Sequence, residues 1–230
     1  MPVAVVTGAS RGFGRALAED LVRDGWDVVI DARNGDALQL AADELAVVAP
    51  GVTIRAIPGD VADEAHRAEL IAAATTLGRL DLLVNNASVL GPSPQPTLDA
   101  YPLAVLQHVY LVNVVAPLGL VQRALPLLIE SAGTIVNATS DAAIEGYEGW
   151  GGYGSSKAAL EQLSNVLAAE QPGIRVYWFD PGDMRTQMHQ EAFPGEDISD
   201  RPLPEAVIPT FRRLLHDAPP SGRYGATDLL

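Results

Sequence analysis

Two residues that could move a proton stand four positions apart in the run Tyr153-Gly154-Ser155-Ser156-Lys157. On a helix, residues i and i+4 share a face, so the phenol of Tyr153 and the ammonium of Lys157 lie side by side. An ammonium beside a phenol favours the phenolate and lowers the tyrosine pKa from its usual value of about 10. Such a tyrosine can donate a proton to a carbonyl oxygen or accept one from an alcohol. The pair therefore indicates acid–base chemistry at a carbonyl or alcohol.

Lys157 is the only lysine in a chain that has fourteen arginines. A sequence that uses arginine almost everywhere else can retain lysine where a compact ammonium with a tunable pKa is needed. The alternative is compositional bias, with one lysine left by chance.

A glycine-rich turn follows the first apolar run of the chain. The run 3–7 is typical of a strand, and Gly8-Ala9-Ser10-Arg11-Gly12-Phe13-Gly14 stands between it and a helix-length segment. Glycines there let the backbone approach a pyrophosphate, whose charge meets the helix N-terminus. Glycine also ends strands for purely structural reasons, so the turn alone is weak evidence. Its place between strand and helix makes it typical of a dinucleotide site.

The second expected strand ends in Asp31-Ala32-Arg33, where the adenosine ribose of a dinucleotide should lie. A carboxylate binds the free 2′-hydroxyl of NAD, whereas the 2′-phosphate of NADP needs an arginine and no competing acid. If Ala32 faces the ribose, Asp31 points to the opposite face and NADP is preferred; a shift of one residue reverses the preference. Arg33 and Arg11 can then clamp the phosphate. We favour NADP, with NAD as the alternative, and either side chain alone could instead be simply solvated.

Strand-like runs alternate with helix-length amphipathic segments along the whole chain. We expect strands at 3–7, 27–31, 52–57, 80–85, 134–138, 175–179 and, more weakly, 223–226. We expect helices at 14–24, 36–48, 63–77, 101–130, 152–170 and 204–216. Continuous apolar strands suit a parallel sheet covered on both faces, and the alternation predicts a doubly wound α/β fold, the Rossmann fold, with about seven strands.

No linker divides the sequence, so we predict a single domain over residues 1–230. Residues 1–90 form mainly the cofactor-binding half and residues 91–186 the catalytic half. Residues 187–204 are irregular and are expected to form a lid over the substrate. The cofactor is expected at the carboxyl ends of the strands.

The motifs fall in the order of a known family. From residue 3 to about 186, the sequence resembles the short-chain dehydrogenase/reductase family. The glycine-rich turn is similar to that family's Thr-Gly-x-x-x-Gly-x-Gly, Asp60-Val61 follows the third strand, and Asn85-Asn86-Ala87 ends the fourth. Ser88 departs from the family, which has glycine there. With the arginine clamp, the cofactor-binding set that this resemblance implies is Gly8, Ser10, Arg11, Gly12, Phe13, Gly14, Arg33, Asp60, Val61, Asn86, Ala87, Tyr153, Lys157, Pro181, Gly182 and Thr186.

The catalytic set implied by the resemblance is Asn113, Ser140, Tyr153 and Lys157. Ser140 follows the fifth strand and would hydrogen-bond the substrate oxygen on which Tyr153 acts. Pro181-Gly182 and Thr186 follow the sixth strand, where the family embraces the nicotinamide and its phosphates.

Asn113 has a proline four residues later, Pro117, which has no amide hydrogen to bond the Asn113 carbonyl. We hypothesise that this free carbonyl holds a water that touches Lys157, which would complete a proton path to Tyr153. The alternative is simply a kinked core helix, with Pro117 relieving a packing conflict.

The formal net charge of −14 makes nucleic acid and anionic membranes unsuitable partners. No run reaches the eighteen or so uninterrupted apolar residues of a membrane span, and no basic segment precedes the first strand, so we expect a cytoplasmic protein. The chain has no cysteine, and its four histidines lack metal-ligand spacing, so we expect no metal.

We therefore predict an NADP-dependent oxidoreductase that transfers hydride reversibly between NADP(H) and a small-molecule carbonyl or secondary alcohol. A non-catalytic NADP(H)-binding sensor or scaffold of the same fold is the alternative. A sugar-nucleotide epimerase is disfavoured, because little chain follows Thr186. The resemblance implies a homodimer or homotetramer. Candidates for an apolar substrate wall are Tyr147, Trp150, Met184, Met188 and Phe193, with ordinary packing as the alternative for each. Of the four histidines, only His189, in the expected lid, is a candidate to meet the substrate.

Overall fold

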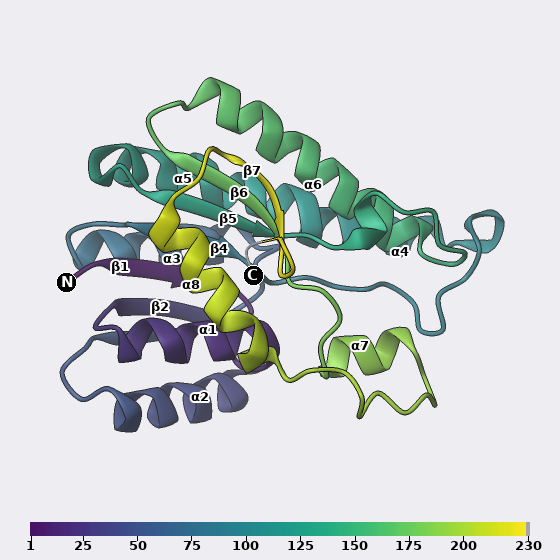
Figure 1. Ribbon diagram of the computed structural model, residues 1–230, viewed down its shortest axis with the longest axis horizontal. Coiled ribbons are helices and arrows are strands. Elements are labelled where there is room, and N and C mark those ends of the chain that lie inside the picture. Colours follow the sequence, from purple (N-terminus) through teal and green to yellow (C-terminus); the bar gives the residue numbers. More distant parts are fainter. Residues whose placement is uncertain (229–230) are drawn as a thin grey trace.

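A seven-stranded parallel sheet forms the centre of the protein. The computed structural model describes residues 1–228, and its strand order is β3-β2-β1-β4-β5-β6-β7. All neighbouring strands are parallel. The chain starts in the middle of the sheet, builds outward to β3 and crosses back to β4, so the order reverses between β1 and β4 (Figure 1). This is the doubly wound Rossmann fold that the sequence predicts.

Most elements lie within two residues of their expected bounds, the usual uncertainty of such assignments. The last helix is the exception, because a 3-10 turn occupies Pro204–Val207 and α8 begins four residues later than expected. The strands are β1 (Val3–Val6), β2 (Asp27–Ala32), β3 (Ile54–Pro58), β4 (Leu82–Asn85), β5 (Thr134–Ala138), β6 (Arg175–Asp180) and β7 (Gly222–Gly225). The helices are α1 (Gly12–Arg23), α2 (Gly35–Val48), α3 (Glu64–Thr76), α4 (Leu103–Tyr110), α5 (Ala116–Ser131), α6 (Gly151–Glu170), α7 (Gln187–Ala192) and α8 (Ile208–Asp217).

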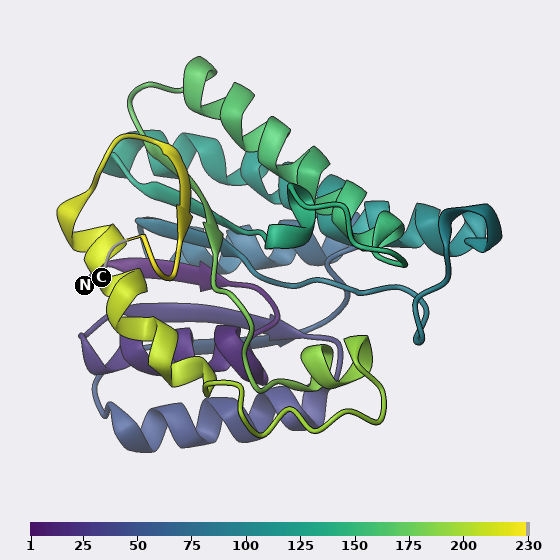
Figure 2. The same ribbon diagram turned by 45° about the vertical axis from the view of Figure 1, so that its right-hand side comes forward.

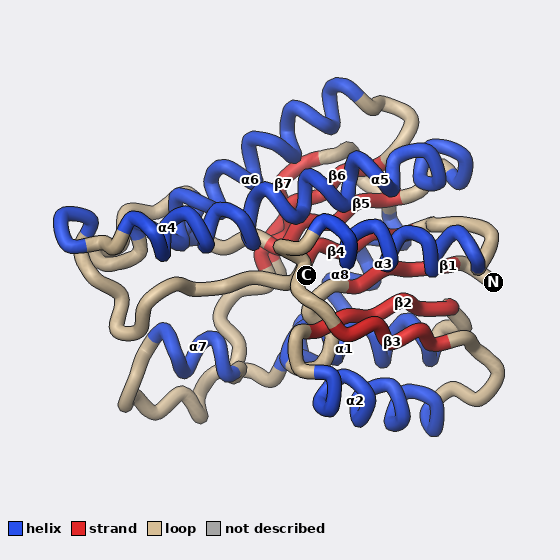
Figure 3. Tube along the Cα trace, turned by 180° about the vertical axis from the view of Figure 1, so that it is seen from behind, coloured by secondary structure: helices blue, strands red, loops and turns tan. Residues whose placement is uncertain are grey.

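Helices cover both faces of the sheet. Helices α1, α2 and α8 lie on one face, and α3, α5 and α6 lie on the other (Figure 3). Successive side chains of a strand point to opposite faces, so Ala4 and Val6 of β1 enter one apolar cluster and Val3 and Val5 enter the other. Both faces of the sheet are therefore covered by apolar side chains, which explains why the strands are continuously apolar rather than alternating between apolar and polar residues.

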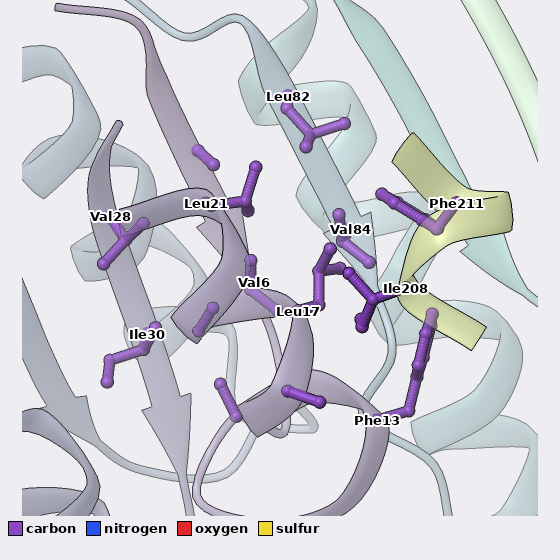
Figure 4. Close-up of a cluster of buried hydrophobic side chains, with 14 of the residues drawn as sticks. Val6, Phe13, Leu17, Leu21, Val28, Ile30, Leu82, Val84, Ile208 and Phe211 are labelled. Atoms are coloured by element: carbon purple, nitrogen blue, oxygen red, sulfur yellow. The ribbon is translucent and has the colours of Figure 1, made fainter. Parts of the chain in front are cut away.

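The start of α1 packs into the apolar cluster that Ala4 and Val6 of β1 also enter. Figure 4 shows Phe13 and Leu17 of α1 pointing toward Ile208 and Phe211 of α8. The Phe13 ring lies 5.8 Å from that of Phe211 and 6.1 Å from that of Phe179 at the end of β6. Aromatic contacts of this kind contribute about 0.5–1.5 kcal/mol beyond area burial. Phe13 thus anchors the end of the glycine-rich turn, of which it is a part, in the apolar core.

The expected long helix is interrupted by a π-helical segment, Leu111–Val115, which joins α4 to α5. There the Ala116 amide bonds the Leu111 carbonyl, five residues back. The wide turn lies next to Pro117, which has no amide to donate, and the sequence analysis did not anticipate it.

By length and composition alone, the continuous helix Leu103–Ser131 could cross a membrane, with a mean hydropathy of 1.7 in its most apolar window. Core helices of folded domains pass the same test. In this fold α5 packs against α3, and Leu120, Ala124 and Leu128 are buried in the second apolar cluster.

The segment after β6 is more ordered than expected. Residues 187–204 were expected to be irregular, but α7 occupies Gln187–Ala192 and lies beyond the carboxyl ends of the strands (Figures 1 and 2). The Thr186 hydroxyl oxygen caps this helix by accepting from the His189 amide at 3.2 Å. Threonine is a favoured N-cap residue, so a signal for the helix was present in the sequence.

Candidate active site

The glycine-rich turn lies at the carboxyl end of β1 and is bonded to residues that follow β4. Asn86 Nδ2 donates to the carbonyl oxygens of Thr7 and Gly8 at 2.9 and 3.2 Å. The buried Thr7 hydroxyl oxygen accepts from the amides of Asn86 and Ala87, both at 3.0 Å. These bonds cross the point where the strand order reverses, which is where open α/β sheets bind their ligands.

Glycines in this turn are required by both conformation and space. Gly8 and Gly12 have φ angles of +67° and +59°, which L side chains rarely adopt. A Cβ atom at Gly14 would lie 2.6 Å from the Gly8 carbonyl oxygen and 2.5 Å from Asn86 Nδ2. The turn therefore presents bare backbone to the adjoining pocket at the start of α1, as a dinucleotide pyrophosphate requires.

At the end of β2, the carboxylate of Asp31 is buried, whereas the side chains of Arg33 and Arg11 are exposed. Asp31 is 2% exposed, and its carboxylate accepts from the Gly8 amide at 2.7 Å and lies 3.0 Å from His66 Nε2. Arg33 and Arg11 are exposed and line the pocket. Arg33 makes no hydrogen bond or ion pair with any of residues 1–228, whereas Arg11 donates to Gln187 Oε1 at the start of α7. Asp31 is thus engaged within the protein, which leaves arginine for a 2′-phosphate.

Tyr153 and Lys157 lie one turn apart on α6 and line the same pocket. Lys157 Nζ is 5.5 Å from the centre of the Tyr153 ring and donates to the Ala138 carbonyl oxygen at 2.8 Å. Burial lowers the pKa of Lys157 to about 8, while the carboxylates of Asp180 and Glu161 act in the opposite direction. The ammonium form is therefore easier to deprotonate than that of an exposed lysine.

Burial raises the pKa of Tyr153 above its usual value of 10.0, and the Asp180 carboxylate raises it further. Hydrogen bonds with Ser88 and Ser140 act in the opposite direction. The expectation that this pKa lies below its usual value is wrong, because burial and the Asp180 carboxylate raise it instead. At neutral pH the phenol keeps its proton and can serve as a proton donor.

Ser140 follows β5 and faces the same pocket. Its hydroxyl donates to Asp141 Oδ1 at 2.9 Å, and the second oxygen of Asp141 accepts from the Tyr147 hydroxyl at 3.0 Å. The resemblance did not single out Asp141, although it adjoins Ser140 in the sequence. This carboxylate holds the serine hydroxyl at the mouth of the pocket beside Tyr153.

Asn113 lies behind the pocket wall, in the π-helical segment, and is 1% exposed. Its Oδ1 accepts from the Val89 amide at 2.9 Å and from the Ser88 hydroxyl at 3.1 Å. Its Nδ2 donates to Ser156 Oγ at 3.0 Å, so it ties the segment after β4 to the helix that carries Tyr153. Ser88 thus uses the hydroxyl that distinguishes it from the family's glycine. The water path through the Asn113 carbonyl stays a prediction.

A charged cluster beside Lys157 was missed by the sequence analysis. Arg223, on β7, donates to Asp180 Oδ2 at 2.9 Å and to Glu161 Oε1 at 3.0 Å. Glu161 also accepts from the Thr139 hydroxyl at 2.7 Å. These residues come from β7, β6, α6 and the end of β5, so no local sequence pattern joins them.

A row of rings connects Tyr153 to α7. Trp150 lies 5.9 Å from Tyr153 and 5.8 Å from Phe193, measured between ring centres, and Phe193 lies 4.9 Å from His189. The Tyr147 ring also lies near Trp150, with 6.4 Å between the ring centres. Of the expected wall residues, Trp150, Met184 and Met188 line the pocket, and so does His189. Tyr147 and Phe193 do not line it but lie against the Trp150 ring.

The structure brings nearly all the expected site residues to one pocket of about 770 Å³. Gly14 and Asn113 are the exceptions, since both lie behind its wall. The volume is in the range of cofactor and ligand sites. Within residues 1–228, no cluster of three or more histidine, aspartate or glutamate side chains is arranged to hold a metal ion.

Comparison with known proteins identifies the family. Residues 2–197 match the short chain dehydrogenase family model, and the chain belongs to this family of oxidoreductases. It is 36% identical to mouse (Mus musculus) sepiapterin reductase over 201 residues, which are 83% of this chain and 77% of that protein. It is 34% identical to a serine 3-dehydrogenase from Rhizobium radiobacter, over 80% of this chain and 72% of that protein.

Solved structures of the family share the whole fold. A short chain dehydrogenase from Shigella flexneri, complexed with NADP, superposes with a TM-score of 0.90 at 31% identity, covering 98% of this chain and 96% of that one. A relative from Escherichia coli CFT073, complexed with NADPH, gives 0.91 at 30% identity with the same coverage of both chains. The family and the fold expected from the sequence are therefore confirmed.

Proposed function

We propose that the protein catalyses reversible hydride transfer between NADP(H) and a carbonyl or secondary alcohol, with Tyr153 as general acid and base. The observation that carries this proposal is that Tyr153, Lys157 and Ser140 line the same pocket as the glycine-rich turn and Arg33. A proton donor therefore lies in the same pocket as a turn that suits a dinucleotide, as carbonyl reduction requires.

NADP(H) is the cofactor that fits these residues. The glycine-rich turn offers bare backbone for the pyrophosphate, and Arg33 is available for a 2′-phosphate. Arg11 would exchange its hydrogen bond with Gln187 for one with that phosphate. Asp31, the acid that could have bound a free 2′-hydroxyl, is engaged with the Gly8 amide and His66. The related Shigella and Escherichia structures, complexed with NADP and NADPH, support the same choice.

When bound, NADPH supplies the hydride that reduces the carbonyl carbon. Tyr153 donates its hydroxyl proton to the carbonyl oxygen, so that the carbonyl becomes an alcohol. The Ser140 hydroxyl turns its hydrogen from Asp141 to the same oxygen and stabilises the negative charge that develops there. Lys157 places a positive charge beside Tyr153 as the phenol loses its proton. Asn113 holds the segment after β4 against α6 and thereby fixes the position of Ser156 next to Lys157.

The test is NADPH consumption with a panel of aldehydes, ketones and quinones. Tyr153→Phe removes the hydroxyl and should reduce turnover at least a hundredfold, the usual scale of general acid catalysis. Tyr224→Phe is the matched control, because it removes an exposed hydroxyl whose hydrogen-bond partner within residues 1–228 is the Pro220 carbonyl oxygen. Equal rates for Tyr153→Phe and the parent would contradict the catalytic role of Tyr153.

The alternative is a non-catalytic sensor or scaffold that binds NADP(H) without turnover. It predicts tight NADPH binding and no consumption with any carbonyl in the panel. The adjacent placement of Tyr153, Lys157 and Ser140 at the pocket favours the enzyme, because NADP(H) binding alone needs no proton donor there.

Assembly into a homodimer or homotetramer and a cytoplasmic location belong to the same proposal. Leu111, Val115 and Leu118 are exposed apolar residues on the long helix Leu103–Ser131, and they support assembly through that helix. Light scattering after size-exclusion chromatography measures the number of subunits.

A further inference from the structure

A buried acid–base pair beneath the glycine-rich turn has no part in the proton transfer described above. Asp31 and His66 are 2% and 6% exposed, and Asp31 Oδ2 lies 3.0 Å from His66 Nε2. An ionised carboxylate oxygen only accepts hydrogen bonds, so Nε2 carries the hydrogen of this bond. The other oxygen, Oδ1, accepts from the Gly8 amide at 2.7 Å, and the Asp31 carbonyl accepts from the Ala9 amide at 2.9 Å. Asp31 therefore holds the turn at two successive amides.

His66 also fills the space beside the turn that follows β3. A Cβ atom at Gly59 would lie 2.2 Å from His66 Nδ1, so the imidazole packs directly on bare backbone. The Gly59 amide donates to the Ala32 carbonyl at 3.0 Å, and Gly59 and Asp60 line the cofactor pocket. His66 thus supports the ends of β2 and β3 and, through Asp31, the turn after β1.

The negative charge of the Asp31 carboxylate disfavours the binding of a phosphate ligand at the nearby turn. Its carboxylate is one hydrogen bond away from the turn that is shaped to receive a pyrophosphate. Burial reduces screening by water and salt, so an uncompensated charge there would repel the phosphates. Arg67 is also buried, but its Nη1 donates to the Val61 carbonyl at 2.6 Å. Among residues 1–228, His66 is the side chain that pairs with Asp31.

We propose that His66 is a positioning residue for the dinucleotide. It holds Asp31 and Gly59 so that the glycine-rich turn keeps its binding shape, and it compensates the Asp31 carboxylate that would otherwise repel the phosphates. The inference rests on NADP(H) being the ligand, as proposed above. His66 does not line the pocket, so its effect is on cofactor affinity rather than on proton transfer.

The first measurement is NADPH binding by titration calorimetry, which does not depend on turnover. His66→Leu removes the donor and should weaken NADPH binding about tenfold, the scale of leaving a buried acceptor unsatisfied. Turnover at saturating NADPH should change little. His216→Leu is the matched control and should bind NADPH like the parent, because His216 is an exposed residue of α8.

The second measurement separates charge from packing. Asp31→Asn keeps an oxygen for the Gly8 amide but removes the negative charge, so it should bind NADPH at least as tightly as the parent. The double variant Asp31→Asn/His66→Leu should recover most of the affinity that His66→Leu loses. A histidine that acted only by filling space would show no such recovery, because both variants lack the imidazole.

His66→Gln keeps an amide donor and should retain most of the affinity, which makes the test independent of whether His66→Leu folds. Parent-like NADPH affinity in His66→Leu, or no recovery in the double variant, would overturn the role of His66. If the parent itself bound no NADPH, the cofactor assignment would fail as well, so the two failures are distinguishable.

Discussion

Arg223 Nη2 donates to Asp180 Oδ2 at 2.9 Å, so the last strand supplies a positive charge beside the proposed catalytic pair. The same guanidinium bonds Glu161 at 3.0 Å. Both carboxylates raise the pKa of Lys157, and Asp180 also raises that of Tyr153. Because Arg223 pairs with both carboxylates, we expect it to limit the shift that they impose on the pKa values of both groups.

Replacement of Arg223 by leucine should move the pH dependence of reduction. Without the guanidinium, Asp180 and Glu161 act fully on Lys157, whose pKa rises. The alkaline decline of kcat/KM should move upward by about one pH unit. Arg23→Leu is the control, because Arg23 forms an exposed ion pair with Glu19 on α1. A profile identical to the parent's would show that Arg223 does not influence the catalytic pair.

The parent enzyme should lose reductase activity above about pH 8. Lys157 has its pKa lowered to about 8 by burial, so its charge is present below that pH and is lost above it. Tyr153 has a raised pKa and keeps its proton across this range. The first alkaline decline in kcat/KM therefore belongs to Lys157, and it should be measured with NADPH and one carbonyl substrate from pH about 5 to 10.

The Lys157→Arg variant tests whether activity needs only the positive charge of Lys157 or also its compact shape, in the same pH profile of kcat/KM. Arginine stays protonated, so the decline near pH 8 should vanish. Lys157 is only 2% exposed and its ammonium donates to the Ala138 carbonyl, so a planar guanidinium should fit poorly and reduce kcat at least tenfold. Full activity in this variant would mean that charge alone suffices and that the single lysine reflects composition.

Arg33→Ala should change the choice of cofactor. Loss of a charged hydrogen bond to the 2′-phosphate should weaken NADPH binding by about 1.5–3 kcal/mol and leave NADH binding nearly unchanged. Arg55→Ala is the control, because Arg55 is exposed on β3 and does not line the pocket. The dissociation constants of both cofactors check the result, and an unchanged preference would place the ribose site elsewhere.

Gly14→Ala should damage the glycine-rich turn. Its Cβ would lie 2.6 Å from the Gly8 carbonyl oxygen, a backbone atom that cannot move aside as a side chain can. We expect a loss of about 1–3 kcal/mol in unfolding free energy and weaker NADPH binding. Gly173→Ala meets no atom within 4 Å and serves as the control in denaturant unfolding. Equal stability of the two variants would contradict the close approach.

Much of the fold could be predicted because each element has a local signal. The apolar runs of β1 and β4 and the glycines between β1 and α1 mark a parallel sheet with a ligand turn. Thr186 capped a helix that was overlooked, because six residues are too short to show apolar periodicity. The π-helical segment before Pro117 was missed for another reason: proline shows which hydrogen bond is absent but not which one replaces it.

The sequence by itself determined which residues are candidates for the chemistry, because Tyr153 and Lys157 are one helical turn apart and the glycine-rich turn has a fixed spacing. Only the tertiary structure decided the state of those groups. Burial and the Asp180 carboxylate on β6 shift the pKa values of Tyr153 and Lys157 on α6, and Arg223 on β7 pairs with that carboxylate. The contacts of Asp31 with the Gly8 amide and with His66 are likewise formed only in the assembled fold. Solvation and charge act through space, so contacts between residues distant in sequence emerge only when the strands are assembled.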